Sequence, residues 1–172
     1  ERVCLDLEEA EERITDRTKV LILNSPCNPT GMMIPRDDLK AVSEFVERND
    51  LRVISDEVYE KFIYNNHPHI SFASISGMEE RTLTVNSFSK TYAMTGFRVG
   101  YVYGPENIIA SLWLVHQYFV ACVDSISQYV ALSVLTGPQD FVKEMVEEFD
   151  KRRHLVHSRL NEIEGMHCPL PK

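Results

Sequence analysis

The chain has 172 residues, 44% hydrophobic and 26% charged, which is enough for one ordinary domain with a buried core and excludes disordered and collagen-like classes. Its formal net charge is -8, so broad binding to nucleic acid or to an anionic membrane is not expected. No apolar run approaches the roughly 18 residues of a membrane-spanning helix, and no signal peptide is recognisable. We therefore expect a cytoplasmic protein with reduced cysteines, because its four cysteines form no CxxC pair.

The first part of the chain alternates short helices with apolar strands. An acidic helix is expected at residues 6–16, and "TKVLILNS" (18–25) is a β-branched and leucine-rich run typical of a buried parallel strand. A helix is expected from 36 to 48, where apolar residues recur at helical spacing. Further strands are predicted at residues 51–59, 82–88 and 97–104. This order predicts an α/β layer architecture with a largely parallel sheet.

After Pro105 the sequence becomes helical. Helices are predicted at 106–118, where Trp113 and Tyr118 are expected to be core residues, and at 125–136. A third helix is predicted from 139 to 163, beyond the break at Gly137-Pro138, and is long enough to link two bodies. It carries an apolar stripe formed by Phe141, Val142, Met145, Val146, Phe149, Val156, Leu160 and Ile163. We therefore divide the chain into a core at 1–137 and a linking segment at 138–172.

Polar residues follow the predicted strands. The candidates, in chain order, are Asn28, Asp56, Tyr59, Ser87, Ser89, Lys90 and Arg98. Ligands of open α/β sheets bind outside the carboxyl ends of the strands, so these side chains are expected to converge. Each of these residues, considered alone, could equally belong to a tight turn, a solvated strand end or a charged surface and have no part in binding. The joint spacing is what indicates a binding site. The six histidines show no metal-ligand spacing, and no metal is expected.

Three segments carry a family resemblance: "NSPCNPTG", "VISDEVYEKFIY" and "SFSKTYAMTGFRVGY". In this order and at these separations they resemble the class I and II aminotransferases, pyridoxal-phosphate enzymes of fold type I. The resemblance covers nearly the whole chain. It implies the central part of the large domain, a three-layer α/β/α sandwich with a mainly parallel sheet, followed at 138–172 by a long linking helix and the start of a small domain.

The same resemblance implies a function. The whole protein would be a homodimer that moves an amino group between an amino acid and a 2-oxo acid. Two alternatives share the same cofactor cradle: a β-elimination lyase or synthase of the same fold, and a non-catalytic regulator domain that binds pyridoxal phosphate. An unrelated α/β domain with chance motifs is a third.

The resemblance also implies a role for each candidate. Lys90 would form the Schiff base with pyridoxal 5'-phosphate and then shuttle protons, Asp56 would face the ring nitrogen, and Tyr59 with Asn28 would face the phenolic oxygen. Lys90, Asp56 and Tyr59 would be catalytic. Ser87, Ser89 and Arg98 would bind the phosphate. Physical chemistry agrees, because a carboxylate favours the charged ring nitrogen and a guanidinium fork suits a dianionic phosphate.

Other parts that the resemblance implies fall outside the sequence. It begins at Glu1 without a methionine and reads as an internal piece. A phosphate-binding turn and a stacking aromatic residue would lie upstream of Glu1, and the arginine for the substrate carboxylate downstream of Lys172. We therefore expect these 172 residues alone to be inactive, and the sequence does not predict which amino acid is the substrate.

Overall fold

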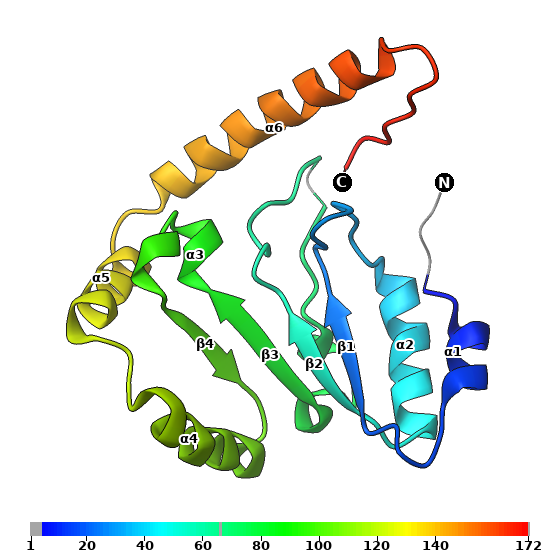
Figure 1. Cartoon of the computed structure of the whole chain (residues 1–172), viewed down its shortest axis with the longest axis vertical. Coiled ribbons are helices and arrows are strands. Elements are labelled where there is room, and N and C mark those ends of the chain that lie inside the picture. The colour runs from blue at the N-terminus through cyan, green and yellow to red at the C-terminus, as the bar shows by residue number, and fades with distance from the viewer. Residues whose placement is uncertain (1–4, 66, 172) are drawn as a thin grey trace.

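The computed structural model describes residues 5–65 and 67–171 (Figure 1). The strands are β1 (Val20–Asn24), β2 (Arg52–Asp56), β3 (Thr82–Ser87) and β4 (Gly100–Tyr103). The helices are α1 (Leu7–Arg13), α2 (Arg36–Arg48), α3 (Phe88–Thr91), α4 (Glu106–Val120), α5 (Ser125–Thr136) and α6 (Asp140–Asn161), with short 3₁₀ helices η1 (Phe72–Ser74), η2 (Glu79–Arg81) and η3 (Thr95–Phe97). In the described part of the chain, no helix has the length and apolar character that a membrane span requires.

The four strands form one sheet in the order β1-β2-β3-β4. β1, β2 and β3 are parallel, whereas β4 runs antiparallel to β3. The prediction of an α/β fold with a mainly parallel sheet is confirmed. The predicted strand at 97–104 starts later, at Gly100, because Phe97 belongs to η3 and Arg98 takes a left-handed conformation at φ 52. Since β4 is antiparallel, its first residue pairs with Ser87, the last residue of β3.

The main core lies between α2 and one face of the sheet. Apolar residues at helical spacing on α2 pack against Leu23 of β1 and Val53 of β2. The α2 residues in this core are Leu39, Val42, Phe45 and Val46. Complete burial of one such side chain stabilises the fold by about 1.5–3 kcal/mol. This core holds β1 and β2 in register, which fixes the positions of the loops that leave their carboxyl ends.

The opposite face of the sheet carries a row of apolar residues. Ile22, Ile54 and Leu83 are in register across β1, β2 and β3, and Ile22 is 69% exposed. Strand residues alternate between faces, so this row points away from Leu23 and Val53. In the described residues, α2 therefore covers one face of the sheet, and the face that carries Ile22 is left largely uncovered.

The C-terminal half is less buried than the sheet region. Helix α5 contributes Ala131 to a small core with Phe88, Met94 and Val99. Helix α4 has no buried residue and lies at the periphery beyond the end of β4 (Figure 1). The prediction that Trp113 and Tyr118 are core residues is wrong for the described chain, in which they are 64% and 86% exposed. Their apolar helix suggested burial, but no described element packs over them.

Helix α6 confirms the predicted long helix, although it ends at Asn161. Of its apolar stripe only Val142 is buried, and Phe149 and Val156 remain exposed. Figure 1 shows α6 spanning the carboxyl edge of the sheet, on the side where β1, β2 and β3 end. The division between residues 137 and 138 stays a prediction. The position of α6 nevertheless places one of its sides over the candidate site.

Candidate active site

Lys90 lies directly after β3, in the short helix α3. Ser87 caps this helix: its Oγ accepts a hydrogen bond from the Ser89 backbone N–H at 3.1 Å and donates to the Val99 carbonyl at 3.3 Å. The cap fixes the first turn of α3 at the carboxyl edge, so Lys90 emerges there half-buried. Among the described residues, no carboxylate lies within ion-pair distance of its amine. The Nζ atom instead lies 5.7 Å from the centre of the Tyr59 ring.

Asn28 and Tyr59 meet above the ends of β1 and β2. The Asn28 backbone N–H donates to Asn24 Oδ1 at 3.1 Å, which ties the turn after β1 to the strand end. The Asn28 side-chain amide then donates to the Tyr59 hydroxyl at 3.2 Å. Two polar groups that are 31 residues apart in sequence are thereby brought together beside Lys90.

Asp56 is the last residue of β2 and is half-buried. Its carbonyl accepts a hydrogen bond from the Ser25 N–H at 3.2 Å, and its Oδ1 accepts one from the Val58 N–H at 3.3 Å. The strand register sets Asp56 opposite Asn24 on one side and Val85 on the other. Its carboxylate therefore stands at the centre of the carboxyl edge.

An open cavity of about 730 Å³ joins these elements. Four predicted residues line it: Asn28, Tyr59, Ser89 and Lys90. Asp56, Ser87 and Arg98 do not line it. Ser87 is held in the α3 cap, and the exposed Arg98 donates to the Thr95 carbonyl at 2.8 Å. The structure thus gathers four of the predicted residues around the cavity and places the other three at the same sheet edge.

The opposite wall of the cavity was not predicted from the sequence. Helix α6 and the C-terminal segment supply it, through Met145, Phe149, Arg152, Arg153, Val156, His157, Cys168 and Pro171. Met145, Phe149 and Val156 belong to the apolar stripe, which marked a buried face of α6 but not what it would cover. That information depends on tertiary structure alone.

Arg153 joins the two walls. Its guanidinium lies 4.2 Å from the centre of the Tyr64 ring, 2.6 Å from Asp150 Oδ1, and bonds the Pro171 carbonyl. Burial raises the pKa of the Tyr64 hydroxyl, and Arg153 only partly opposes this. Pro171 in turn packs against Gly31, where φ is 66 and an added Cβ would lie 2.6 Å from the proline. The C-terminal segment is therefore attached to the turn that carries Asn28.

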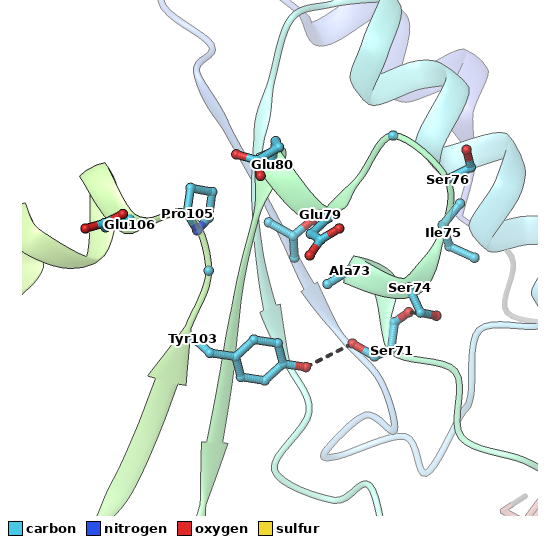
Figure 2. Close-up of a pocket in the computed structure, with 13 residues that line it drawn as sticks. Ser71, Ala73, Ser74, Ile75, Ser76, Glu79, Glu80, Tyr103, Pro105 and Glu106 are labelled. Atoms are coloured by element: carbon cyan, nitrogen blue, oxygen red, sulfur yellow. Dashed lines mark hydrogen bonds between the residues drawn. The ribbon is translucent and has the colours of Figure 1, made fainter.

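A second cavity, of about 810 Å³, lies at the other edge of the sheet, where β3 begins and β4 ends. Figure 2 shows Glu79, Glu80 and Glu106 around it, with the Tyr103 hydroxyl 3.3 Å from Ser71 Oγ. No Lys, Arg or His lines it among the described residues. An acidic wall disfavours a phosphorylated ligand. The first cavity is therefore the candidate site.

The groups at the carboxyl edge fit a particular ligand chemistry. An amine without a carboxylate partner suits an electrophilic carbonyl, and the amide and phenol pair suits an oxyanion. A carboxylate suits a protonated ring nitrogen, whereas hydroxyls and a guanidinium suit a phosphate. Pyridoxal phosphate carries all four features, so the residues present fit this cofactor.

Comparison with known proteins gives a consistent result. The sequence model of the family "Aminotransferase class I and II" matches residues 1–172. An aspartate aminotransferase of Pyrococcus abyssi is 46% identical over 98% of the chain, which covers 43% of that relative. An aromatic-amino-acid aminotransferase of Thermococcus litoralis is 41% identical, again over 98% of the chain and 43% of the relative. The chain thus spans less than half the length of these curated relatives.

Solved structures agree with the sequence relatives. The crystal structure of the aspartate aminotransferase of Rhizobium meliloti superposes with a TM-score of 0.94 at 40% identity, covering 98% of this chain and 42% of that one. The aromatic aminotransferase of Pyrococcus horikoshii gives a TM-score of 0.93 at 47% identity, covering 98% and 45%. The arrangement of β1 to β4 and of the helices around them is therefore shared with these enzymes.

Proposed function

Because this chain belongs to the class I and II aminotransferases, we propose that the whole protein transfers an amino group between an amino acid and a 2-oxo acid, with pyridoxal phosphate as cofactor. The observation that carries the proposal is the position of Lys90 at the end of β3, where its amine faces Tyr59 and has no described carboxylate partner. The sequence relatives are named as aminotransferases, and none of the observations favours a lyase or a regulator.

Each residue at the edge has a part in this proposal. Bound pyridoxal phosphate supplies an electron sink for negative charge on the substrate Cα. Lys90 would hold the cofactor through its amine, and the same amine would move the proton at the substrate Cα. Asp56 keeps the ring nitrogen charged, because an adjacent carboxylate favours the charged form. Asn28 and Tyr59 donate to the phenolic oxygen.

We assign the phosphate to Ser87, Ser89 and Arg98. The Ser87 hydroxyl donates to the Val99 carbonyl in this structure, so it would have to turn away from that carbonyl to donate to the phosphate. Arg98 uses one N–H group on the Thr95 carbonyl, and a guanidinium has five, so several remain for an anion. The N–H groups at the start of α3 lie beside them, although a helix of four residues adds little dipole of its own. Binding the phosphate at this end of the site leaves the wall formed by α6 for the substrate.

We further propose that the whole protein is a homodimer. The support is the apolar surface of α4 and α5, where the aromatic side chains are more than half exposed; they are Trp113, Tyr118, Phe119 and Tyr129. Sedimentation of the full-length protein would test this, and a concentration-independent monomer would contradict it. The cytoplasmic location remains a prediction.

The reaction can be tested on the full-length protein loaded with pyridoxal phosphate. Adding an amino acid together with a 2-oxo acid that has a different side chain should yield two products in equal amounts. One is the 2-oxo acid formed from the added amino acid, and the other is the amino acid formed from the added 2-oxo acid. Release of ammonia without a new amino acid would favour the lyase, and cofactor binding without turnover would favour the regulator. Lys90→Ala serves as the control, since it removes the proposed point of attachment.

A further inference from the structure

Strand β2 ends at Asp56, and Glu57 follows it directly, so two adjacent carboxylates at this strand end point to opposite faces of the sheet. Residues of a strand alternate between faces, so Ser55 and Glu57 share one face and Asp56 takes the other. Asp56 is half-buried at the carboxyl edge, whereas Glu57 is 2% exposed on the side of η1. Glu57 is a buried charged group to which the proposed reaction assigns no part.

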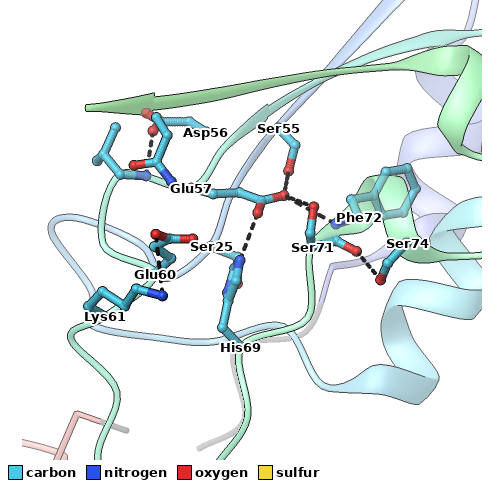
Figure 3. A network of polar contacts seen from close by, with 12 residues as sticks. Ser25, Ser55, Asp56, Glu57, Glu60, Lys61, His69, Ser71, Phe72 and Ser74 are labelled. Carbon is cyan, nitrogen blue, oxygen red and sulfur yellow. Dashed lines mark hydrogen bonds and ion pairs between the residues drawn. The ribbon is translucent and has the colours of Figure 1, made fainter. Parts of the chain in front are cut away.

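Four groups hold the Glu57 carboxylate in place (Figure 3). Oε1 accepts hydrogen bonds from Ser55 Oγ at 2.8 Å, from Ser71 Oγ at 3.0 Å and from the Phe72 N–H at 3.1 Å. Oε2 lies 2.7 Å from His69 Nε2. Both oxygens therefore have partners, and these partners come from β2, from the segment before η1 and from η1 itself.

These contacts close the loop that carries Tyr59. The loop leaves β2 after Asp56 and returns at His69 and Ser71, which bind the side chain of the residue where the loop begins. Tyr59 lies within this closed segment. Closing a loop through side chains at both ends restricts the positions available to every residue between them.

The backbone on either side of Asp56 is held as well. The Glu57 N–H donates to the Val85 carbonyl at 2.9 Å, and the Asp56 carbonyl accepts from the Ser25 N–H at 3.2 Å. The peptide groups are thus fixed by β3 and β1, and the Glu57 side chain anchors the far face. With Glu57 held there, Asp56 is directed to the other face.

We propose that Glu57 and His69 form a positioning pair for Asp56 and Tyr59. The proposal rests on the proposed function, because it assigns the pair the task of holding Asp56 against the ring nitrogen and Tyr59 against the phenolic oxygen. Neither Glu57 nor His69 lines the candidate cavity. They act through the strand end and the loop, so their loss alters the environment of the cofactor without removing any group that touches it.

The test compares the full-length wild-type protein with Glu57→Gln, which keeps the shape of the side chain and removes its charge. Two quantities are measured. One is the pH midpoint of the visible absorption band of the bound cofactor, and the other is amide hydrogen exchange at residues 58–62 in the cofactor-free protein. We expect a shift of the midpoint by roughly half a pH unit or more, and about tenfold faster exchange in this loop.

A matched control separates positioning from stability. Val46→Ala opens a cavity in the core beneath α2, at a residue that makes none of the bonds to Glu57, and should lower the unfolding temperature without moving the midpoint or loosening residues 58–62. His69→Ala should shift the midpoint in the same direction as Glu57→Gln, and His69→Gln, which can donate to the same oxygen, should restore it. These two variants keep the proposal testable if Glu57→Gln does not fold.

The outcomes distinguish this inference from the proposed function. If the wild-type protein shows no absorption band from a cofactor on Lys90, the proposed function fails, and the exchange measurement still decides whether Glu57 holds the loop. If the band forms but Glu57→Gln and His69→Ala change only the unfolding temperature, as Val46→Ala does, the pair is structural and the inference is wrong.

Discussion

Two regions at the carboxyl edge of the sheet differ in how far their polar groups are satisfied. One is the surroundings of Glu57, which we call the sealed face, and the other is the surroundings of Lys90 and Asp56, which we call the open face. On the face of Glu57, a carboxylate has four partners and is sealed from water. On the open face, Lys90 lines the cavity and has no described carboxylate partner. The Asp56 side chain, at the same sheet edge but outside the cavity lining, accepts only the Val58 N–H among the described hydrogen bonds. Fully bonded groups hold a structure in place, whereas partly bonded groups remain available to a ligand.

The largest expected effect comes from Lys90, on the open face. Lys90→Ala should lower the rate of amino-group transfer by roughly 10²–10⁴-fold or more, because it removes both the attachment point and the proton carrier. Single-turnover kinetics of the full-length protein would measure this. A rate within threefold of wild type would show that the open face does not hold the reactive group.

Asp56→Ala should come next. The cofactor should still bind through Lys90 and the phosphate contacts, but the rate of proton removal should fall by about 10²–10³-fold, as for loss of one preorganised electrostatic group. The matched comparison is Asp50→Ala, an exposed carboxylate at the other end of β2 that pairs with Arg81 at 2.7 Å. Equal rates in the two variants would refute a role for Asp56.

Arg98→Lys should weaken cofactor binding by about tenfold, near 1.4 kcal/mol, while the charge stays the same. An ammonium group cannot offer the planar fork of a guanidinium. Equilibrium dialysis of pyridoxal phosphate would measure the change. Arg52→Lys is the control, because Arg52 donates to the Glu80 carbonyl at the far edge of the sheet. Unchanged affinity in Arg98→Lys would argue against phosphate contact.

The smallest expected effect is on the pH dependence of the free energy of unfolding, through Glu57 on the sealed face. Burial raises the pKa of the Glu57 carboxyl, but hydrogen bonds from His69, Ser55 and Ser71 outweigh it, so the folded-state pKa lies below the usual 4.5. The stability that Glu57 contributes is therefore complete above about pH 4.5 and is lost as the pH falls through the folded-state value. Urea unfolding between pH 3 and 6 should show a shallower pH dependence in Glu57→Gln. If the unfolding free energy of Glu57→Gln depended on pH as steeply as that of the wild type, the Glu57 carboxyl would not be responsible for this pH dependence.

The sequence predicted the open face better than the sealed one. The strands, α2 and α5 follow from apolar runs and helical spacing, and Lys90, Asn28 and Tyr59 follow from spaced motifs. The roles of Asp56 and Glu57 could not be separated by composition, since "SDE" offers two acids side by side. Only the pairing of β2 with β1 and β3 decides which one is buried.

The C-terminal half was predicted less well for a related reason. The helical periodicity of α4 and α6 was visible, but periodicity does not reveal what covers an apolar face. Phe149 and Val156 turned out to line the cavity, whereas Trp113 and Tyr118 lie exposed on α4. Both facts depend on where the helices lie relative to the sheet, which local sequence does not specify.

In the proposed enzyme Lys90 holds the cofactor at the carboxyl edge of the sheet. Adding pyridoxal phosphate to the full-length protein, reducing it with borohydride and mapping the labelled peptide tests this most directly. The label should be found on Lys90. Label on Lys61, which pairs with Glu60 at 3.7 Å, or on Lys19, just before β1 at the other edge of the sheet, would show that Lys90 is not the attachment point.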